Sequence, residues 1–183
     1  LFSEVAWMGT EQSSNNEWIE LQNIAEGDLD ISNWRLLNRT GKIDITFSNI
    51  IMRPNTFLLL ERTDDTSVPE ISADLVYVGA LNNETEGLRL FDAHCTLIDE
   101  VIVDGAWPAG DVKEKRSMER QIDRSWRTYR GERVGGILGT PKRENRIQYG
   151  SADPSPIMAI DGNAKARGAS APLPRPRILI AEV

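Results

Sequence analysis

Residues 17–21 read Glu-Trp-Ile-Glu-Leu, a short stretch that combines bulky apolar residues with two glutamates. Such a stretch is typical of a strand with one face in a core and the other in solvent. We therefore expect Trp18 to pack in the interior, and Glu17 and Glu20 to lie on the surface of a sheet. The four other tryptophans are interpreted in the same way, as packing residues.

Stretches of similar character recur about every ten residues on both sides of this one, separated by Asn, Gly and Pro residues that favour turns. No segment shows a convincing helical period. The candidate strands are residues 1–7, 17–23, 29–37, 42–47, 56–61, 74–78, 88–92, 97–103 and 117–121. About nine short strands predict an all-β fold, a sandwich of two sheets.

The composition excludes several classes of protein. The chain has 183 residues, a net charge of -7, one Cys and one His. A single Cys forms no internal disulfide, and no apolar run reaches the roughly 18 residues of a membrane span, so we expect no membrane insertion. No leader precedes the first strand, and the chain begins without Met, so we expect a mature or excised part of a longer protein.

The charge is unevenly distributed along the chain. Residues 1–110 carry 6 basic and 19 acidic residues, whereas residues 111–148 carry 11 basic and 6 acidic ones. Arginines close to aromatic residues suit contact with phosphates and stacking on bases. The candidate polyanion-binding residues are Lys113, Lys115, Arg116, Arg120, Arg124, Arg127, Arg130 and Arg133. The alternative is that these cations form salt bridges to the acidic body, because glutamates and aspartates are interspersed among them.

No catalytic motif is found. His94 and Cys95 are neighbours in a turn, and adjacent side chains of an extended chain point apart, so they do not form a nucleophilic pair. The glycine-rich stretch 135–142 lacks the Gly-Lys-Ser/Thr ending of a phosphate-binding loop. Carboxylate pairs such as Asp99 and Glu100 are interpreted as exposed residues on the surface of a sheet. We therefore predict no catalytic or cofactor-binding residues. No motif in the sequence supports a hydrolase activity.

The acidic composition of residues 1–110 offers carboxylates of the kind that bind calcium. Residues 28–39 begin like a helix-flanked calcium loop but have Asn33 and Arg39 where Gly and Glu are required. Asp64 and Asp65, and Glu84 and Glu86, lie in expected loops, where the alternatives are oxygen ligands of an irregular calcium site and solvated charges. We predict no metal site.

The composition changes after residue 148. Residues 149–177 are rich in Pro, Ala and Gly and predict an extended linker. Residues 178–183 are a candidate strand, and residues 179–183 resemble residues 1–5, with Leu, Glu and Val identical. This segment begins a second similar domain, is an unrelated apolar strand, or pairs with an open sheet edge of a neighbouring molecule. The candidate assembly residues are Ile178, Leu179, Ile180 and Val183.

Several short motifs together resemble the lamin tail domain, an immunoglobulin-like module of nuclear lamins that also occurs in prokaryotic proteins. The matching stretches are residues 4–9, 16–23, 29–36, 99–101, 107–108, 117–120, 126, 139–141 and 145. Two positions depart from the family pattern, in which glycine is usual: this chain has Asn33 and Lys142 there.

The resemblance implies an immunoglobulin-like β-sandwich over residues 1–148 without catalytic residues of its own. It implies a structural or binding module of a secreted or cell-surface prokaryotic protein, which mediates contacts with other protein domains or with copies of itself. The alternative is an accessory nucleic-acid-binding domain attached to a nuclease or another hydrolase. Cofactors are not expected.

Overall fold

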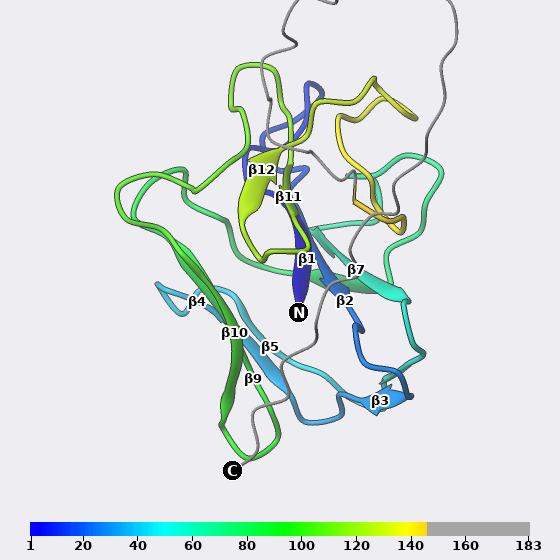
Figure 1. The fold of residues 1–183 in the computed structure, drawn as a ribbon. Helices are drawn as coiled ribbons and strands as arrows, with labels where there is room; N and C mark the ends of the chain where they lie inside the picture. The colour runs from blue at the N-terminus through cyan, green and yellow to red at the C-terminus, as the bar shows by residue number, and fades with distance from the viewer. Residues whose placement is uncertain (146–183) are drawn as a thin grey trace, which may run out of the picture. The chain divides into compact units, whose positions relative to one another are not determined.

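The computed structural model describes residues 1–145 and shows an all-β fold (Figure 1). No helix occurs in these residues, and hence none that is long and apolar enough to cross a membrane. The strands are β1 (Phe2–Ala6), β2 (Trp18–Gln22), β3 (Leu29–Asp30), β4 (Arg35–Asn38), β5 (Asp44–Thr46), β6 (Ile51–Met52), β7 (Phe57–Arg62), β8 (Leu75–Tyr77), β9 (Gly87–Phe91), β10 (Leu97–Ile102), β11 (Met118–Arg120) and β12 (Trp126–Thr128).

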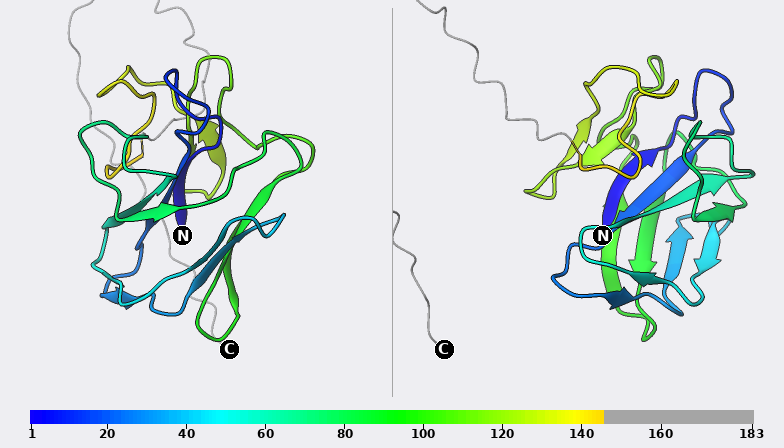
Figure 2. Two further views of the ribbon diagram at one scale, coloured as in Figure 1. Left: turned by 180° about the vertical axis from the view of Figure 1, so that it is seen from behind. Right: turned by 90° about the vertical axis from the view of Figure 1, so that its right-hand side faces the viewer.

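Two main sheets form a β-sandwich, seen from two further sides in Figure 2. The first has the order β12-β11-β1-β2-β7-β8 and the second the order β10-β9-β4-β5, while β3 and β6 pair separately. All pairs are antiparallel except β7 with β8. The predicted all-β sandwich is therefore confirmed.

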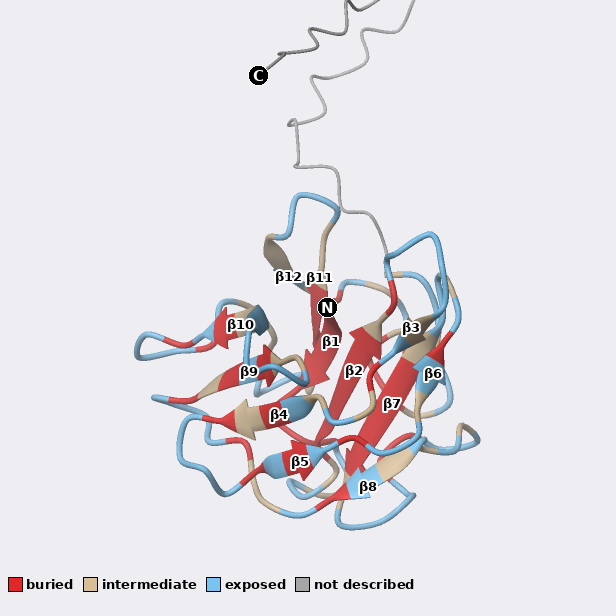
Figure 3. Ribbon diagram, turned by 90° about the horizontal axis from the view of Figure 1, so that it is seen from below, coloured by how far each residue is buried: buried red, intermediate tan, exposed pale blue. Residues whose placement is uncertain are grey.

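The core lies between the two sheets (Figure 3). Val5, Ile19 and Leu60 lie side by side on neighbouring strands of the first sheet and are fully buried. Leu36 and Leu90, also paired and buried, contribute from the second sheet. Each such side chain stabilises the fold by roughly 1.5–3 kcal/mol through removal from water.

Three details differ from the predicted strands. The expected strand 29–37 is interrupted, because Asn33 adopts a left-handed backbone with φ of 64° and the chain turns there. The two-residue strand β6 and the three-residue strand β12 were not predicted, since neither is long enough to show an alternating pattern. The result is twelve strands instead of about nine.

The prediction that the strand glutamates lie on the surface is wrong. Glu17 and Glu20 are buried, and the Asp99 side chain is only 8% exposed; Glu100 alone is partly exposed. The cause is that the outer face of the first sheet is covered by loops, so β2 is buried on both faces. Trp7, Trp18 and Trp107 are buried as expected.

The predicted linker, residues 149–177, and the predicted strand, residues 178–183, lie outside the described residues. So do the last three residues of the predicted sandwich, 146–148.

Candidate functional site

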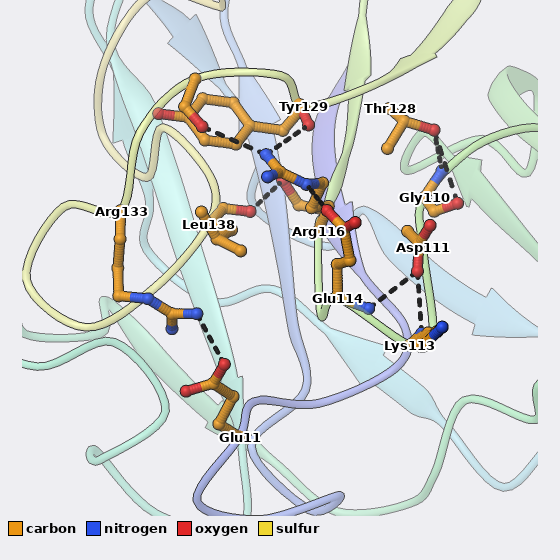
Figure 4. A network of polar contacts seen from close by, with 12 residues as sticks. Glu11, Gly110, Asp111, Lys113, Glu114, Arg116, Thr128, Tyr129, Arg133 and Leu138 are labelled. Carbon is orange, nitrogen blue, oxygen red and sulfur yellow. Dashed lines mark hydrogen bonds and ion pairs between the residues drawn. The ribbon is translucent and has the colours of Figure 1, made fainter.

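The basic segment does not form one free cationic surface. The Lys115 ammonium donates a hydrogen bond to the Met8 carbonyl at 2.9 Å, and Arg133 pairs with Glu11 at 2.6 Å. Arg116 pairs with Glu114 and also donates to backbone carbonyls of the loop that follows β12 (Figure 4). These cations hold loops against the sandwich.

Arg120 joins the two sheets. Its guanidinium, on β11, pairs at 2.9 Å with Asp99 on β10 and lies 4.8 Å from the centre of the Trp126 ring. Asp99 also accepts the Phe2 amide at 2.8 Å. Because both charged side chains are largely buried, this pair is structural and is not available to a phosphate.

The remaining four predicted cations are exposed. Lys113, Arg124, Arg127 and Arg130 form no salt bridge with any of residues 1–145. Arg124 lies in the turn between β11 and β12, Arg127 in β12 and Arg130 just after it. The structure thus divides the predicted polyanion site into a structural half and an exposed half near β12.

Three glutamates form a buried row across the first sheet, which the sequence interpretation missed. Glu4 on β1 is opposite Glu119 on β11 and Glu20 on β2, and all three residues are 0% exposed. The sequence carries a signal only for Glu20, which stands between the apolar residues Ile19 and Leu21, whereas Glu4 and Glu119 each have a polar neighbour. The three carboxyl groups lie on the outer face of this sheet, away from the apolar core.

Residues 139–145 cover this row. The Thr140 amide donates to both Glu4 oxygens, at 3.0 and 3.1 Å, and the Lys142 amide donates to Glu20. The Asn145 side-chain amide donates to the Ser3 and Arg120 carbonyls, at 2.8 and 2.9 Å. The covering segment is therefore anchored by hydrogen bonds to β1, β2 and β11.

Gly139 is required for this close approach. A Cβ atom at this position would lie 2.5 Å from Glu4 Oε1 and 2.9 Å from Ser117 Oγ, both closer than real Cβ contacts. The Ser117 hydroxyl itself donates to Glu4. A side chain at residue 139 would push the segment away from its carboxyl partners.

The Thr140 hydroxyl lies between two carboxyl groups. Its oxygen lies 2.7 Å from Glu119 Oε1 and 3.1 Å from Glu4 Oε2. Because a hydroxyl has only one proton to donate, it donates to one of these carboxyl groups at a time. Burial, with the neighbouring Glu119 charge, raises the pKa of Glu4 to about 8, and burial also raises the pKa of Glu20 well above its usual range.

Other buried glutamates also hold loops. Glu17 accepts the Leu81 amide and pairs with Arg62, while Glu61 accepts the amides of Ser67 and Val68. Burial raises the pKa of both carboxyl groups to about 7, although these hydrogen bonds act in the opposite direction. Carboxylates inside the sandwich thus serve as acceptors for loop amides.

Two of the four acidic residues named for an irregular calcium site, Glu86 and Asp65, accept backbone amides. Glu86 is buried and accepts the amides of Arg39 and Asn82, and Asp65 accepts the Ala73 amide. Among residues 1–145, no three His, Cys, Asp or Glu side chains are grouped as ligands for a metal ion. His94 and Cys95 lie in an exposed turn.

The outer face of the second sheet is open and partly apolar. We define the β9–β10 face by its lining residues Leu37, Arg89, Phe91, Glu100 and Ile102, which surround a hollow of about 690 Å³. Ile102 is 69% exposed, and Leu97, at the other end of β10, is 45% exposed. An antiparallel sheet normally presents polar side chains to water on such a face, so this arrangement suits a protein contact.

No protein-family model and no curated protein matches the chain.

Proposed function

We propose that residues 1–148 form a non-catalytic, immunoglobulin-like module of the lamin-tail type that mediates protein–protein assembly in a secreted or cell-surface protein of a prokaryote. The resemblance of the sequence motifs supports this proposal. So do Asn33 and Lys142, which stand where the family has glycine and have φ of 64° and 54°, the left-handed region that glycine favours.

The β9–β10 face carries the proposal. It combines exposed apolar side chains with a hollow whose lining carries both charge signs, Arg39 and Arg89 with Glu86 and Glu100. Three of the six basic residues within 1–110 lie on this sheet or line its hollow: Arg35, Arg39 and Arg89.

The partner that fits this face is a second copy of the chain. Arg89 pairs with Glu100, and Arg35 pairs with Asp44, so the sheet carries both charge signs next to its apolar residues. A two-fold interface needs a patch that is complementary to itself, and a patch with mixed charges around an apolar centre meets this condition.

Sedimentation velocity of the full chain over a range of concentrations tests the proposal. We expect a reversible monomer–dimer equilibrium that Ile102→Lys weakens at least tenfold. The matched control is Ile122→Lys, which changes an 82% exposed residue in the β11–β12 turn and should leave the equilibrium unchanged. A monomer at all concentrations, or equal effects of the two substitutions, would overturn the proposal.

A second candidate function is polyanion binding by the exposed half of the basic segment. The observation in its favour is that Arg124, Arg127 and Arg130 are exposed within seven positions around β12. Duplex DNA of random sequence is a suitable probe, and binding should weaken steeply with salt. Replacement of the three arginines by serine should abolish binding; if affinity persists, this candidate fails.

A further inference from the structure

The covering segment, residues 139–145, lies on the first sheet without pairing to it as a strand. Its Thr140 and Lys142 amides donate to the carboxyl groups of Glu4 and Glu20. Among residues 1–145, no hydrogen bond between two main-chain groups joins the segment to a strand. Its attachment therefore depends largely on the state of these carboxyl groups.

Apolar packing adds little to this attachment. Pro141 is the only side chain of the segment that is buried, and Arg143 and Glu144 are exposed. Segments with few buried apolar contacts open at a lower free energy than the core of the same protein. The covering segment can therefore open while the apolar core, which lies on the other face of β1, remains closed.

The carboxyl groups under the segment repel one another when they are ionised. Glu4 is opposite Glu20 on one side and Glu119 on the other, and all three residues are 0% exposed. Removal of a carboxylate from water is costly, and a second negative charge nearby adds to the cost. Closing the segment over the row therefore disfavours the ionised form of these groups.

Cations give the row little compensation. Neither Glu4 nor Glu20 forms a salt bridge with a cation of residues 1–145. The charge of Lys142 favours the ionised form of Glu20, but its ammonium group is bound to Asp74 at 2.9 Å. Arg127 on β12 lies on the same side of the sheet and is exposed. The burial of Glu4 and Glu20 is thus not offset by an ion pair.

The covered row accordingly holds protons more tightly than an uncovered row does. Burial, with the charge of Glu119, raises the pKa of Glu4 to about 8 from an ordinary value of 4.5. A group whose pKa is raised in the closed state favours that state at low pH, and this advantage is lost as the pH rises through the raised value. Between about pH 5 and pH 8 the equilibrium should therefore shift about tenfold per pH unit towards the open segment.

We propose that residues 139–145 are a pH-dependent cover, which is closed over β1 in acidic solution and detaches from Glu4 and Glu20 in mildly alkaline solution while the two sheets stay folded. Opening leaves the carboxylates of the row exposed side by side on the outer face of the first sheet. This device goes beyond the proposed assembly function and does not depend on the β9–β10 face, which belongs to the other sheet.

Amide hydrogen exchange of the full chain at pH 6, 7 and 8, corrected for the intrinsic exchange rate at each pH, tests the proposal. The protection of the Thr140 and Lys142 amides should fall about tenfold per pH unit. At pH 8 the amides of β2 should remain at least about 1000-fold more protected than these two, because β2 exchanges only when the sandwich unfolds. Protection of Thr140 and Lys142 that does not change with pH, or that equals the protection of β2 at pH 8, would overturn the proposal.

Glu4→Gln separates the titration of the row from other effects of pH. The glutamine side chain does not ionise, so the protection of Thr140 at pH 8 should be at least about tenfold higher than in the unchanged chain. Glu26→Gln is the matched control, because Glu26 is exposed in the loop after β2 and its replacement should leave the pH dependence unchanged. Equal effects of the two substitutions would also overturn the proposal.

A second variant keeps the test decisive if Glu4→Gln does not fold. Glu20→Gln should raise the protection of the Lys142 amide at pH 8 in the same way, since this amide donates to Glu20. An unchanged pH dependence of that amide would contradict a cover controlled by the row. These outcomes are independent of Ile102→Lys, which tests only the β9–β10 face.

Discussion

The outer face of one sheet is covered by a loop segment, whereas the outer face of the other sheet is open. The outer face of the six-stranded sheet carries buried glutamates and is covered by residues 139–145, which donate backbone amides to them. The outer face of the four-stranded sheet has no such cover within residues 1–145 and presents Ile102 and a hollow to solvent. The contrast indicates that buried carboxyl groups hold the cover on one face, whereas the other face is open to solvent.

The largest difference in stability is expected between two ion pairs: the buried pair that joins the two sheets and an exposed pair on the open sheet. Arg120→Met removes the partner of the largely buried Asp99 and should destabilise the protein by about 3 kcal/mol, because a buried charge is left unpaired. Arg35→Met breaks an exposed pair with Asp44 on the open sheet and should produce no measurable change. Urea denaturation of both variants makes the comparison. Equal losses would show that the buried pair between the sheets stabilises the protein no more than the exposed pair on the open sheet.

The covering segment should be sensitive to added volume. Gly139→Ala places a methyl group against Glu4 and Ser117 and should cost about 2 kcal/mol through overpacking. Gly27→Ala is the matched control, because a Cβ there meets nothing within 4 Å. Thermal unfolding should show a lower midpoint for the first variant only. A tolerated Gly139→Ala would mean that the segment is not held as closely as described.

The Thr140 hydroxyl should contribute a smaller amount. Thr140→Val keeps the shape of the side chain but removes the bond to Glu119 and Glu4, which should cost about 1 kcal/mol. Thr140→Ser retains the hydroxyl and should recover most of that stability. Denaturant midpoints of the two variants provide the measurement, and a valine variant as stable as the serine variant would contradict the hydrogen-bonded arrangement.

The buried carboxyl groups predict the sign of the pH dependence. The folded-state pKa of Glu4, about 8, lies above its ordinary value of 4.5, so the folded state holds this proton more tightly. The stability from this group is complete below about pH 4.5 and is lost as the pH rises through 8. Glu17 and Glu61, with pKa values of about 7, act in the same direction.

The melting temperature should therefore be higher at pH 5 than at pH 8. Glu4→Gln imitates the protonated form and should make this difference smaller. The aspartates with lowered pKa values act only at more acidic pH: Asp30, Asp44, Asp92, Asp111 and Asp123. Greater stability at pH 8, or an unchanged slope in Glu4→Gln, would disagree with the buried carboxyl row.

The sandwich was predictable because it depends on patterns that repeat along the chain. Turn residues such as those at 15–16 and 104–105 separate apolar stretches, and nearly all of the predicted strands occur. The break at Asn33 depends on one backbone angle, and β12 depends on pairing with β11 instead of on its own composition. Such features are set by tertiary context, which local sequence does not specify.

The carboxyl row was missed for a physical reason. A glutamate in a strand normally faces water, and only the covering segment, more than a hundred residues away in sequence, makes Glu4 and Glu20 internal. The sequence identifies the cations of the basic segment but does not show which of them form salt bridges, because that depends on distances in the fold. Arg120 pairs with Asp99, whereas Arg124, four residues later, is exposed.

Amide hydrogen exchange of the full chain at pH 6 tests most directly whether buried carboxyl groups hold residues 139–145 on the outer face of the six-stranded sheet. The amides of Thr140 and Lys142, which lie in no strand and bond only to Glu4 and Glu20, should exchange at least about 100-fold more slowly than in an unstructured peptide. Protection of Thr140 should fall in Glu4→Ala. Exchange of both amides at the rate of an unstructured chain would contradict the account.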